Sequence, residues 1–156
     1  MSIYVVDASV GVKWFVPEVD SDIALRLQDP GHQLHSPSLF DAEVANTIWK
    51  KLRRGELSSV NANAIVAHLP SAPVIRHENG PLVKAAFEVA EKTGRTVYDS
   101  LYLALADAIG GQVISADDRF VNALSGTPWA HLVVGLRQLQ RTRRRFATTD
   151  AGGQGM

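Results

Sequence analysis

Aspartates follow two segments that read as buried strands, at the points where the chain would leave a sheet. Asp7 comes directly after the β-branched and aromatic run 3–6, and Asp117 and Asp118 come just after the run 112–115. Ligands in parallel α/β sheets bind beyond the carboxyl ends of the strands, so chemistry is expected at these points. Taken singly, each aspartate could equally cap the helix that follows it.

Two further acids lie on predicted helices. Glu43 belongs to the amphipathic helix 39–54, on the face opposite its apolar side chains, where it could simply pair with Lys50 in solvent. Asp99 begins the segment 97–106, which is apolar nearly all round and is therefore expected to be buried. The helix dipole stabilises a first-turn carboxylate by only about 0.3–1 kcal/mol. A buried Asp99 therefore needs a compensating cation.

The acids become more informative when they are considered together. Several carboxylates within a few ångströms repel one another strongly at low dielectric, and they stay ionised only around a cation. A ligand set made only of hard oxygens favours Mg²⁺, or Mn²⁺. A divalent metal site is therefore expected where the strand ends and the buried helix converge.

The elements that must position these acids alternate along the chain. The expected strands are 3–6, 32–35, 74–77, 112–115 and 131–134. The expected helices are 8–15, 20–28, 39–54, 58–69, 81–93, 97–109, 118–124 and 136–146. This alternation predicts a three-layer α/β/α sandwich with a central, mainly parallel sheet of four to five strands. Trp49 is expected in its core.

Composition limits the remaining possibilities. The 156 residues are 46% apolar and contain no cysteine, which excludes disulfides, a thiol nucleophile and a zinc ribbon. No apolar run approaches the roughly 20 residues that a membrane span needs, and a cytoplasmic location is expected. Residues 1–118 carry ten basic and fifteen acidic side chains, against six and one in residues 119–156. We expect one domain over 1–146, ending in a basic helix, and a disordered tail over 147–156.

Four segments, in this order, carry a resemblance to a known family. They are Val5-Val-Asp-Ala-Ser9, Pro37-Ser-Leu-Phe-Asp-Ala-Glu-Val-Ala-Asn46, Thr96-Val-Tyr-Asp-Ser-Leu-Tyr-Leu-Ala-Leu-Ala106 and Ile114-Ser-Ala-Asp-Asp-Arg-Phe120. The chain resembles the PIN domain over about residues 3–135, and within it the VapC-type toxin ribonucleases of bacterial toxin–antitoxin pairs. No single segment is specific, but the ordered set is.

The resemblance implies a Mg²⁺-dependent endoribonuclease that leaves a 5′-phosphate and a 3′-hydroxyl. The family's catalytic and metal-binding acids fall on Asp7, Glu43, Asp99 and Asp117, with supporting positions at Ser9, Asn46 and Ser115. Ser115 stands where the family usually has threonine, and Asp118 is an additional acid, so either member of the aspartate pair could face the metal.

The same resemblance implies three partners: RNA, a small VapB-type antitoxin and a second copy of the chain. RNA phosphates could be bound by basic side chains at Lys50, Arg54, Arg119, Arg141 and Arg144. The helices 20–28, 39–54 and 58–69 could form the antitoxin groove. A solvated surface and ordinary core packing are the alternatives to these two assignments.

Other enzyme classes fit the acids less well. A phosphoacceptor receiver domain needs an acid pair after its first strand, whereas here Asp7 stands alone and the pair comes late. A haloacid-dehalogenase-type phosphatase needs an aspartate at the position of Ser9. The remaining alternative is a catalytically degenerate PIN-like module that binds RNA or protein.

Overall fold

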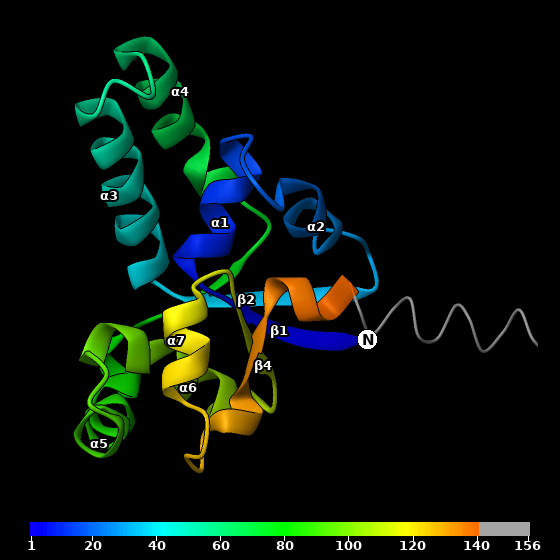
Figure 1. Cartoon of the computed structure of the whole chain (residues 1–156), viewed down its shortest axis with the longest axis vertical. Helices are drawn as coiled ribbons and strands as arrows, with labels where there is room; N and C mark the ends of the chain where they lie inside the picture. Colours follow the sequence, from blue (N-terminus) through cyan, green and yellow to red (C-terminus); the bar gives the residue numbers. More distant parts are fainter. Residues whose placement is uncertain (141–156) are drawn as a thin grey trace, which may run out of the picture.

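Five parallel strands form one sheet in the computed structural model, which describes residues 1–140 of the chain (Figure 1). The strands are β1 (Ser2–Val6), β2 (His32–Pro37), β3 (Ile75–His77), β4 (Gln112–Ser115) and β5 (Val133–Gly135). Their order is β3-β2-β1-β4-β5, and every neighbouring pair is parallel. Most of the predicted basic helix, the predicted tail, Arg141 and Arg144 lie outside the described residues.

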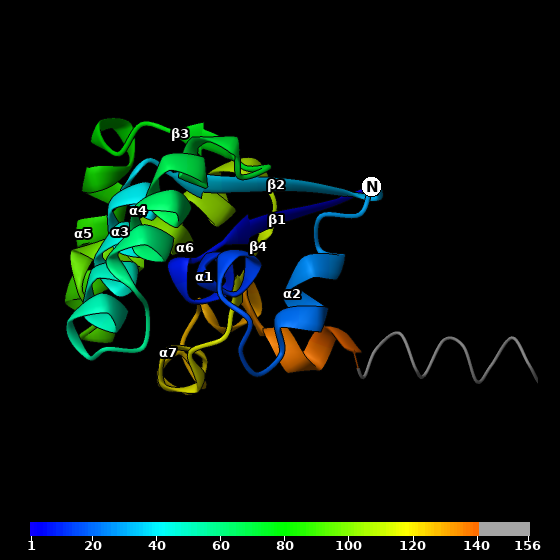
Figure 2. The ribbon, with the colours of Figure 1, turned by 90° about the horizontal axis from the view of Figure 1, so that it is seen from above.

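Helices cover both faces of this sheet (Figure 2). They are α1 (Ala8–Phe15), α2 (Ser21–Arg26), α3 (Leu39–Arg53), α4 (Ser59–His68), α5 (Val83–Thr93), α6 (Val97–Ile109) and α7 (Asp118–Ala123). Val6 and Ile114 face a core built with α1, α2 and α3, whereas Val5 and Val113 face a core built with α6 and α7. The predicted three-layer α/β/α architecture is therefore confirmed.

Several predicted boundaries shift by a few residues. Three short 3₁₀ turns occur in the described part of the chain: η1 (Leu69–Ser71), η2 (Gly80–Leu82) and η3 (Ala130–Leu132). Because of η1, the helix before β3 ends at His68 rather than at residue 69. Because of η2 and η3, α5 begins at Val83 rather than at residue 81, and the last strand begins at Val133 rather than at residue 131. In this part of the chain, no helix is long and apolar enough to cross a bilayer.

One prediction about the core is wrong. Trp49 is 52% exposed, and its ring lies beneath the guanidinium of Arg53 at 5.4 Å. The packed face of α3 instead consists of Phe40, Val44 and Ile48. Trp49 lies at the margin of this stripe, so the apolar side of α3 is wider than the part that the core covers.

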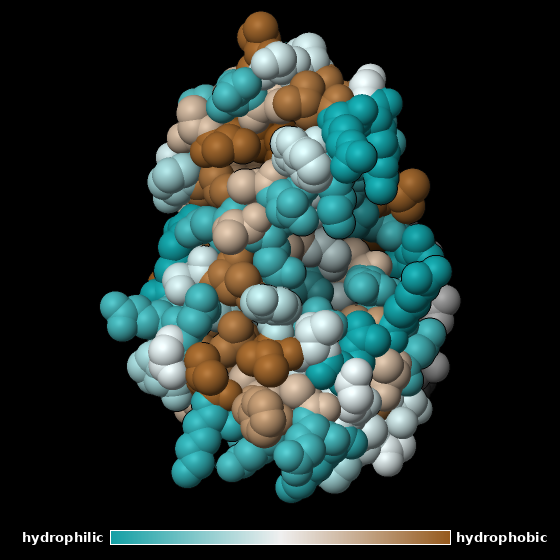
Figure 3. Space-filling model, turned by 90° about the vertical axis from the view of Figure 1, so that its left-hand side faces the viewer, coloured by the Kyte–Doolittle hydropathy of each residue, from teal (hydrophilic) through white to brown (hydrophobic). Residues whose placement is uncertain are grey.

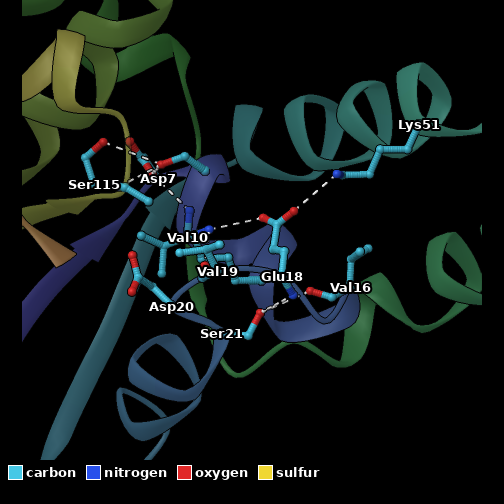
Figure 4. Close-up of polar contacts among 12 residues, drawn as sticks. Asp7, Val10, Val16, Glu18, Val19, Asp20, Ser21, Lys51 and Ser115 are labelled. Atoms are coloured by element: carbon cyan, nitrogen blue, oxygen red, sulfur yellow. Dashed lines mark hydrogen bonds and ion pairs between the residues drawn. The ribbon is translucent and has the colours of Figure 1, made fainter. Parts of the chain in front are cut away.

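Close packing fixes α1 against α3. A Cβ atom at Gly11 would lie 2.5 Å from the ring of Phe40, so only glycine permits this approach. Farther from the sheet, Glu18 accepts hydrogen bonds from Lys13 and from Lys51 of α3, both at 3.2 Å (Figure 4). These contacts set the position of α3 relative to the end of β1.

Candidate active site

Asp7 leaves the sheet at the carboxyl end of β1, next to the end of β4. Its backbone N–H donates to the carbonyl of Ile114, and its side chain accepts from the N–H of Val10 at 3.3 Å, which caps α1. The hydroxyl of Ser9 also donates to the Asp7 carboxyl group and lies 3.5 Å from the hydroxyl of Ser115, which stands beside Asp7 (Figure 4). Both the predicted capping role and the predicted neighbourhood of Ser9 and Ser115 are present.

The Asp7 carboxyl group is costly to ionise. Burial raises its pKa from 3.8 to about 6, and the nearby charge of Glu43 acts in the same direction. The hydrogen bonds from Ser115, Ser9 and Val10 oppose the rise, because they stabilise the carboxylate. A positive charge placed against Asp7 would remove this penalty.

Glu43 lies in the first turns of α3 and reaches across to α6. Its Oε1 accepts a hydrogen bond of 2.7 Å from the hydroxyl of Tyr102, a side chain that is only 2% exposed. Partial burial raises the pKa of Glu43, and the charge of Asp99 raises it further. The pKa of Tyr102 is raised well above its usual range by burial and by the charges of Glu43, Asp7 and Asp99, so its hydroxyl remains a donor.

Asp99 differs from its predicted environment. Its side chain is 33% exposed rather than buried, and its Oδ2 accepts a hydrogen bond of 2.9 Å from the guanidinium of Arg95. The sequence predicted a buried Asp99 compensated by a metal cation; in the structure an arginine one turn earlier in the chain pairs with it instead. Thr96 caps α6 by accepting from the backbone N–H of Asp99.

Asp117 and Asp118 have different surroundings. The N–H of Asp117 donates to the Ser115 hydroxyl at 3.1 Å, and its carboxylate caps α7 by accepting from the N–H groups of Arg119 and Phe120. Asp118 interacts electrostatically with Arg137, whose guanidinium pairs with Asp20 at 2.7 Å. Asp117 thus shares a serine with Asp7, whereas Asp118 belongs to a neighbouring ion-pair group.

The other predicted residues lie on the surface. Asn46 is exposed one turn after Glu43, and Arg119 is exposed in the first turn of α7. Lys50 and Arg54 are exposed toward the far end of α3, and Arg54 lies about 16 Å along the helix axis from Glu43. Among the described residues proposed to bind RNA, Arg119 is therefore the nearest in sequence to a candidate acid.

The acids form an electrostatically coupled cluster but do not converge on one point. Asp7 interacts with Glu43, Glu43 interacts with Asp99, and Tyr102 interacts with all three. Within residues 1–140, no three acidic or histidine side chains lie close enough together to hold one metal ion. Each carboxylate is turned onto a protein donor instead. The donor chemistry, oxygen only and negatively charged, nevertheless fits Mg²⁺ or Mn²⁺.

The sequence analysis missed two side chains at this cluster. Tyr102 follows Asp99 by three residues, so both lie on one face of α6, and a hydroxyl in an otherwise apolar helix was the available signal. Arg95 precedes Asp99 by four residues, the spacing of a helical ion pair. Neither spacing alone indicates a role, because both are common in ordinary helices.

Comparison with known proteins gives a consistent result. The family model described as PIN domain matches residues 4–123. Ribonuclease VapC3 of Pyrobaculum aerophilum is 39% identical over 115 residues, which cover 72% of this chain and 88% of that protein. The residues that the PIN-domain family model matches include Asp7, Glu43, Asp99 and Asp117.

Solved structures share the fold at lower identity. The crystal structure of PAE2754 from Pyrobaculum aerophilum superposes with a TM-score of 0.64 at 22% identity, covering 88% of this chain and 86% of that one. A toxin–antitoxin complex from Klebsiella pneumoniae contains a chain that superposes with a TM-score of 0.59 at 13% identity, covering 87% and 98%. The order of strands and helices found here is therefore an established arrangement.

Proposed function

The chain belongs to the PIN-domain family, and we propose that it is a Mg²⁺-dependent endoribonuclease, the toxin of a type II toxin–antitoxin pair. The family relationship and the relative named Ribonuclease VapC3 support the ribonuclease class. The observation that carries the proposal is the coupling of Asp7, Glu43 and Asp99 around Tyr102 at the carboxyl edge of the sheet. Such a cluster of acids is unfavourable without a cation.

Mg²⁺, or Mn²⁺, would be held by Asp7, Asp99 and Asp117, with Glu43 as a further ligand or as a base. When bound, the ion would lower the pKa of a water molecule and position it in line with a phosphodiester bond. The ion could bind without displacing the donors on Oδ1 of Asp7, Oδ2 of Asp99 and Oδ1 of Asp117, because each of these carboxylates has a second oxygen. The raised pKa of Asp7 supports this role, because a nearby cation would relieve the cost of its charge.

The side chains around the acids have positioning roles in this proposal. Ser9 and Ser115 orient the Asp7 carboxylate, and the N–H of Asp117 shares the Ser115 hydroxyl. Tyr102 holds Oε1 of Glu43 and leaves Oε2 to accept a proton from the attacking water. Asn46 would contact a phosphate or orient Glu43. Attack of this water on phosphorus, with the P–O3′ bond breaking and the 3′-oxygen leaving with a proton, would give the 5′-phosphate and 3′-hydroxyl that the family resemblance implies.

Cleavage of a structured RNA tests the proposal. Asp7→Ala and Asp99→Asn should each lower the rate by about 100-fold or more, equivalent to about 2.7 kcal/mol of transition-state stabilisation. Asp22→Asn, which removes an exposed helical acid paired with Arg26, is the matched control and should cleave normally. EDTA should abolish cleavage, and Mg²⁺ or Mn²⁺ should restore it. If Asp7→Ala and Asp99→Asn are folded and cleave RNA as fast as the wild type, the proposal is contradicted. If the wild type binds RNA without cleaving it, the alternative of a catalytically degenerate module is favoured.

An antitoxin of the VapB type is the proposed protein partner. The fold likeness to a chain in a toxin–antitoxin complex supports this assignment. Apolar side chains on α3 and α4 are exposed, namely Trp49, Val60 and Val66, and Figure 3 shows apolar groups gathered on the side of the molecule where these helices lie. Coexpression with the product of a neighbouring short reading frame should inhibit cleavage, and Trp49→Glu should weaken that inhibition.

A homodimer is also proposed. Sedimentation of the purified chain measures its molecular mass in solution and so tests this proposal.

A further inference from the structure

The turn between α5 and α6 fixes the backbone of Arg95. Gly94 ends α5 with a φ of 73°, in the left-handed region that favours glycine. The N–H of Arg95 donates to the hydroxyl of Thr93 at 3.2 Å, and Thr96 caps the helix that follows. Hydrogen bonds on both sides of Arg95 therefore fix the position of its backbone.

The guanidinium group of Arg95 lies between two helices of the acid cluster. Its Nη2 is 2.9 Å from Oδ2 of Asp99 on α6, and its central carbon is 5.6 Å from the ring centre of Phe120 on α7. The side chain is 26% exposed. In residues 1–140, no other lysine or arginine forms an ion pair with Asp7, Glu43, Asp99 or Asp117.

Most hydrogen-bonding capacity of this guanidinium is unused. The Asp99 contact accounts for one N–H group, while Nε is buried without an acceptor among the described residues. Because Nε is closed to solvent, a ligand could reach only the N–H groups of Nη1, which donates to no acceptor in the described residues, and the remaining N–H of Nη2. These groups belong to a side chain that is partly exposed.

We propose that Arg95 binds a phosphate group of the substrate RNA, and that Asp99 and Phe120 hold its guanidinium ready for this. The inference rests on the proposed ribonuclease function. A planar guanidinium fork matches the geometry of a phosphate and binds it with two hydrogen bonds. An acidic cluster repels a polyanion, so a fixed cation at its edge gives the RNA a point of attachment. Lys50 and Arg54, toward the far end of α3, cannot supply this contact beside Asp99.

RNA binding in EDTA tests this role without cleavage. The probe is a fluorescein-labelled single-stranded RNA, and its Kd is measured by anisotropy over a range of salt concentrations. Arg95→Ala should weaken binding about tenfold near 0.1 M salt, and the slope of log K against log salt should become shallower by about 0.7 to 1. Arg95→Lys should recover part of the affinity, because it retains the charge without the fork.

Arg26→Ala is the matched control, since Arg26 also pairs with an acid four residues away and its loss changes the net charge equally. An Arg95→Ala protein that binds RNA with the affinity and salt slope of Arg26→Ala would overturn the inference. Should Arg95→Ala fail to fold, the ¹⁵N resonance of Arg95 Nε in wild type should shift on RNA addition. A shift no larger than that of Arg26 would also overturn the role.

Cleavage by wild type separates this inference from the function on which it rests. A wild type that binds and cleaves RNA, with binding unaffected by Arg95→Ala, would leave the ribonuclease function standing and remove the role of Arg95. A wild type that neither binds nor cleaves RNA would overturn both.

Discussion

The sheet side and the helix side of the acid cluster tolerate negative charge by different means. On the sheet side, Asp7 is buried and receives hydrogen bonds from hydroxyl and amide groups, and its pKa rises to about 6. On the helix side, Asp99 is one-third exposed and paired with Arg95. Neutral hydrogen-bond donors reduce the free-energy cost of a buried carboxylate charge such as that of Asp7, but they do not remove it. A carboxylate such as Asp99, which is in contact with both water and a guanidinium group, has little of this cost. Asp7, on the sheet side, is therefore where burial most clearly disfavours a carboxylate charge and where a nearby positive charge would relieve that cost.

The largest expected effect is on the pH dependence of the sheet side. Below about pH 3, Asp7 is protonated in both the folded and the unfolded chain, and above about pH 6 the folded chain must bury its charge. A pKa raised to about 6 therefore costs the metal-free protein about 3 kcal/mol of unfolding free energy as the pH rises through this window. Asp7→Asn should lose this dependence, as measured by urea unfolding in EDTA from pH 4 to 7.5.

Asp107→Asn, an exposed substitution on α6, is the control and should keep the wild-type pH dependence. A difference between wild type and Asp7→Asn that does not change with pH would show that burial does not disfavour the Asp7 charge.

A somewhat smaller effect is expected where the two sides are joined. Gly11→Ala places a methyl group 2.5 Å from the fully buried ring of Phe40, which must move together with α3. We expect a loss of about 1–3 kcal/mol in unfolding free energy and weaker RNA cleavage, because Glu43 shifts relative to Asp7. Gly31→Ala, with no atom within 4 Å of the new Cβ, should change stability by less than about 0.5 kcal/mol. Equal stability of the two variants would mean that the contact between α1 and α3 is loose.

Tyr102→Phe should have a moderate effect confined to the helix side. Removing the hydroxyl leaves Glu43 without its donor and should cost about 1 kcal/mol in stability. Because Tyr102 positions Glu43 without touching the RNA, kcat should fall more than KM rises. Tyr98→Phe, at a ring that is 63% exposed, is the control. A change in KM alone would contradict the positioning role.

The smallest stability effect is expected for Asp99→Asn without metal. The pair with Arg95 is partly exposed, so its loss should change the unfolding free energy by less than about 1 kcal/mol. The same substitution should abolish the rise in melting temperature that Mg²⁺ gives the wild type, because a ligand stabilises only a state that binds it. A rise equal to that of wild type would remove Asp99 from the proposed metal site.

The fold was predictable because its signals are local. Short β-branched runs alternate with amphipathic segments, and the aspartates after β1 and β4 follow from the geometry of a parallel sheet. The surroundings of Asp99 were not predictable in this way. Apolar periodicity indicates which helix is buried, but it does not indicate that the first turn of α6 protrudes and meets an arginine from the preceding turn. Trp49 shows the same limit, since the width of an apolar stripe does not reveal how much of it a core covers.

The central place of β1 bears on how the chain acquires its site during synthesis. This strand precedes the other four in the sequence, yet it lies between β2 and β4, and its pairing with β4 joins Tyr4 to Gln112. Contacts so distant in sequence form late, because a long loop must close before they contribute. A nascent chain that ends before β4 lacks Ser115 as well as Asp117, so the residues around Asp7 can come together only after β4 and the start of α7 have been synthesised.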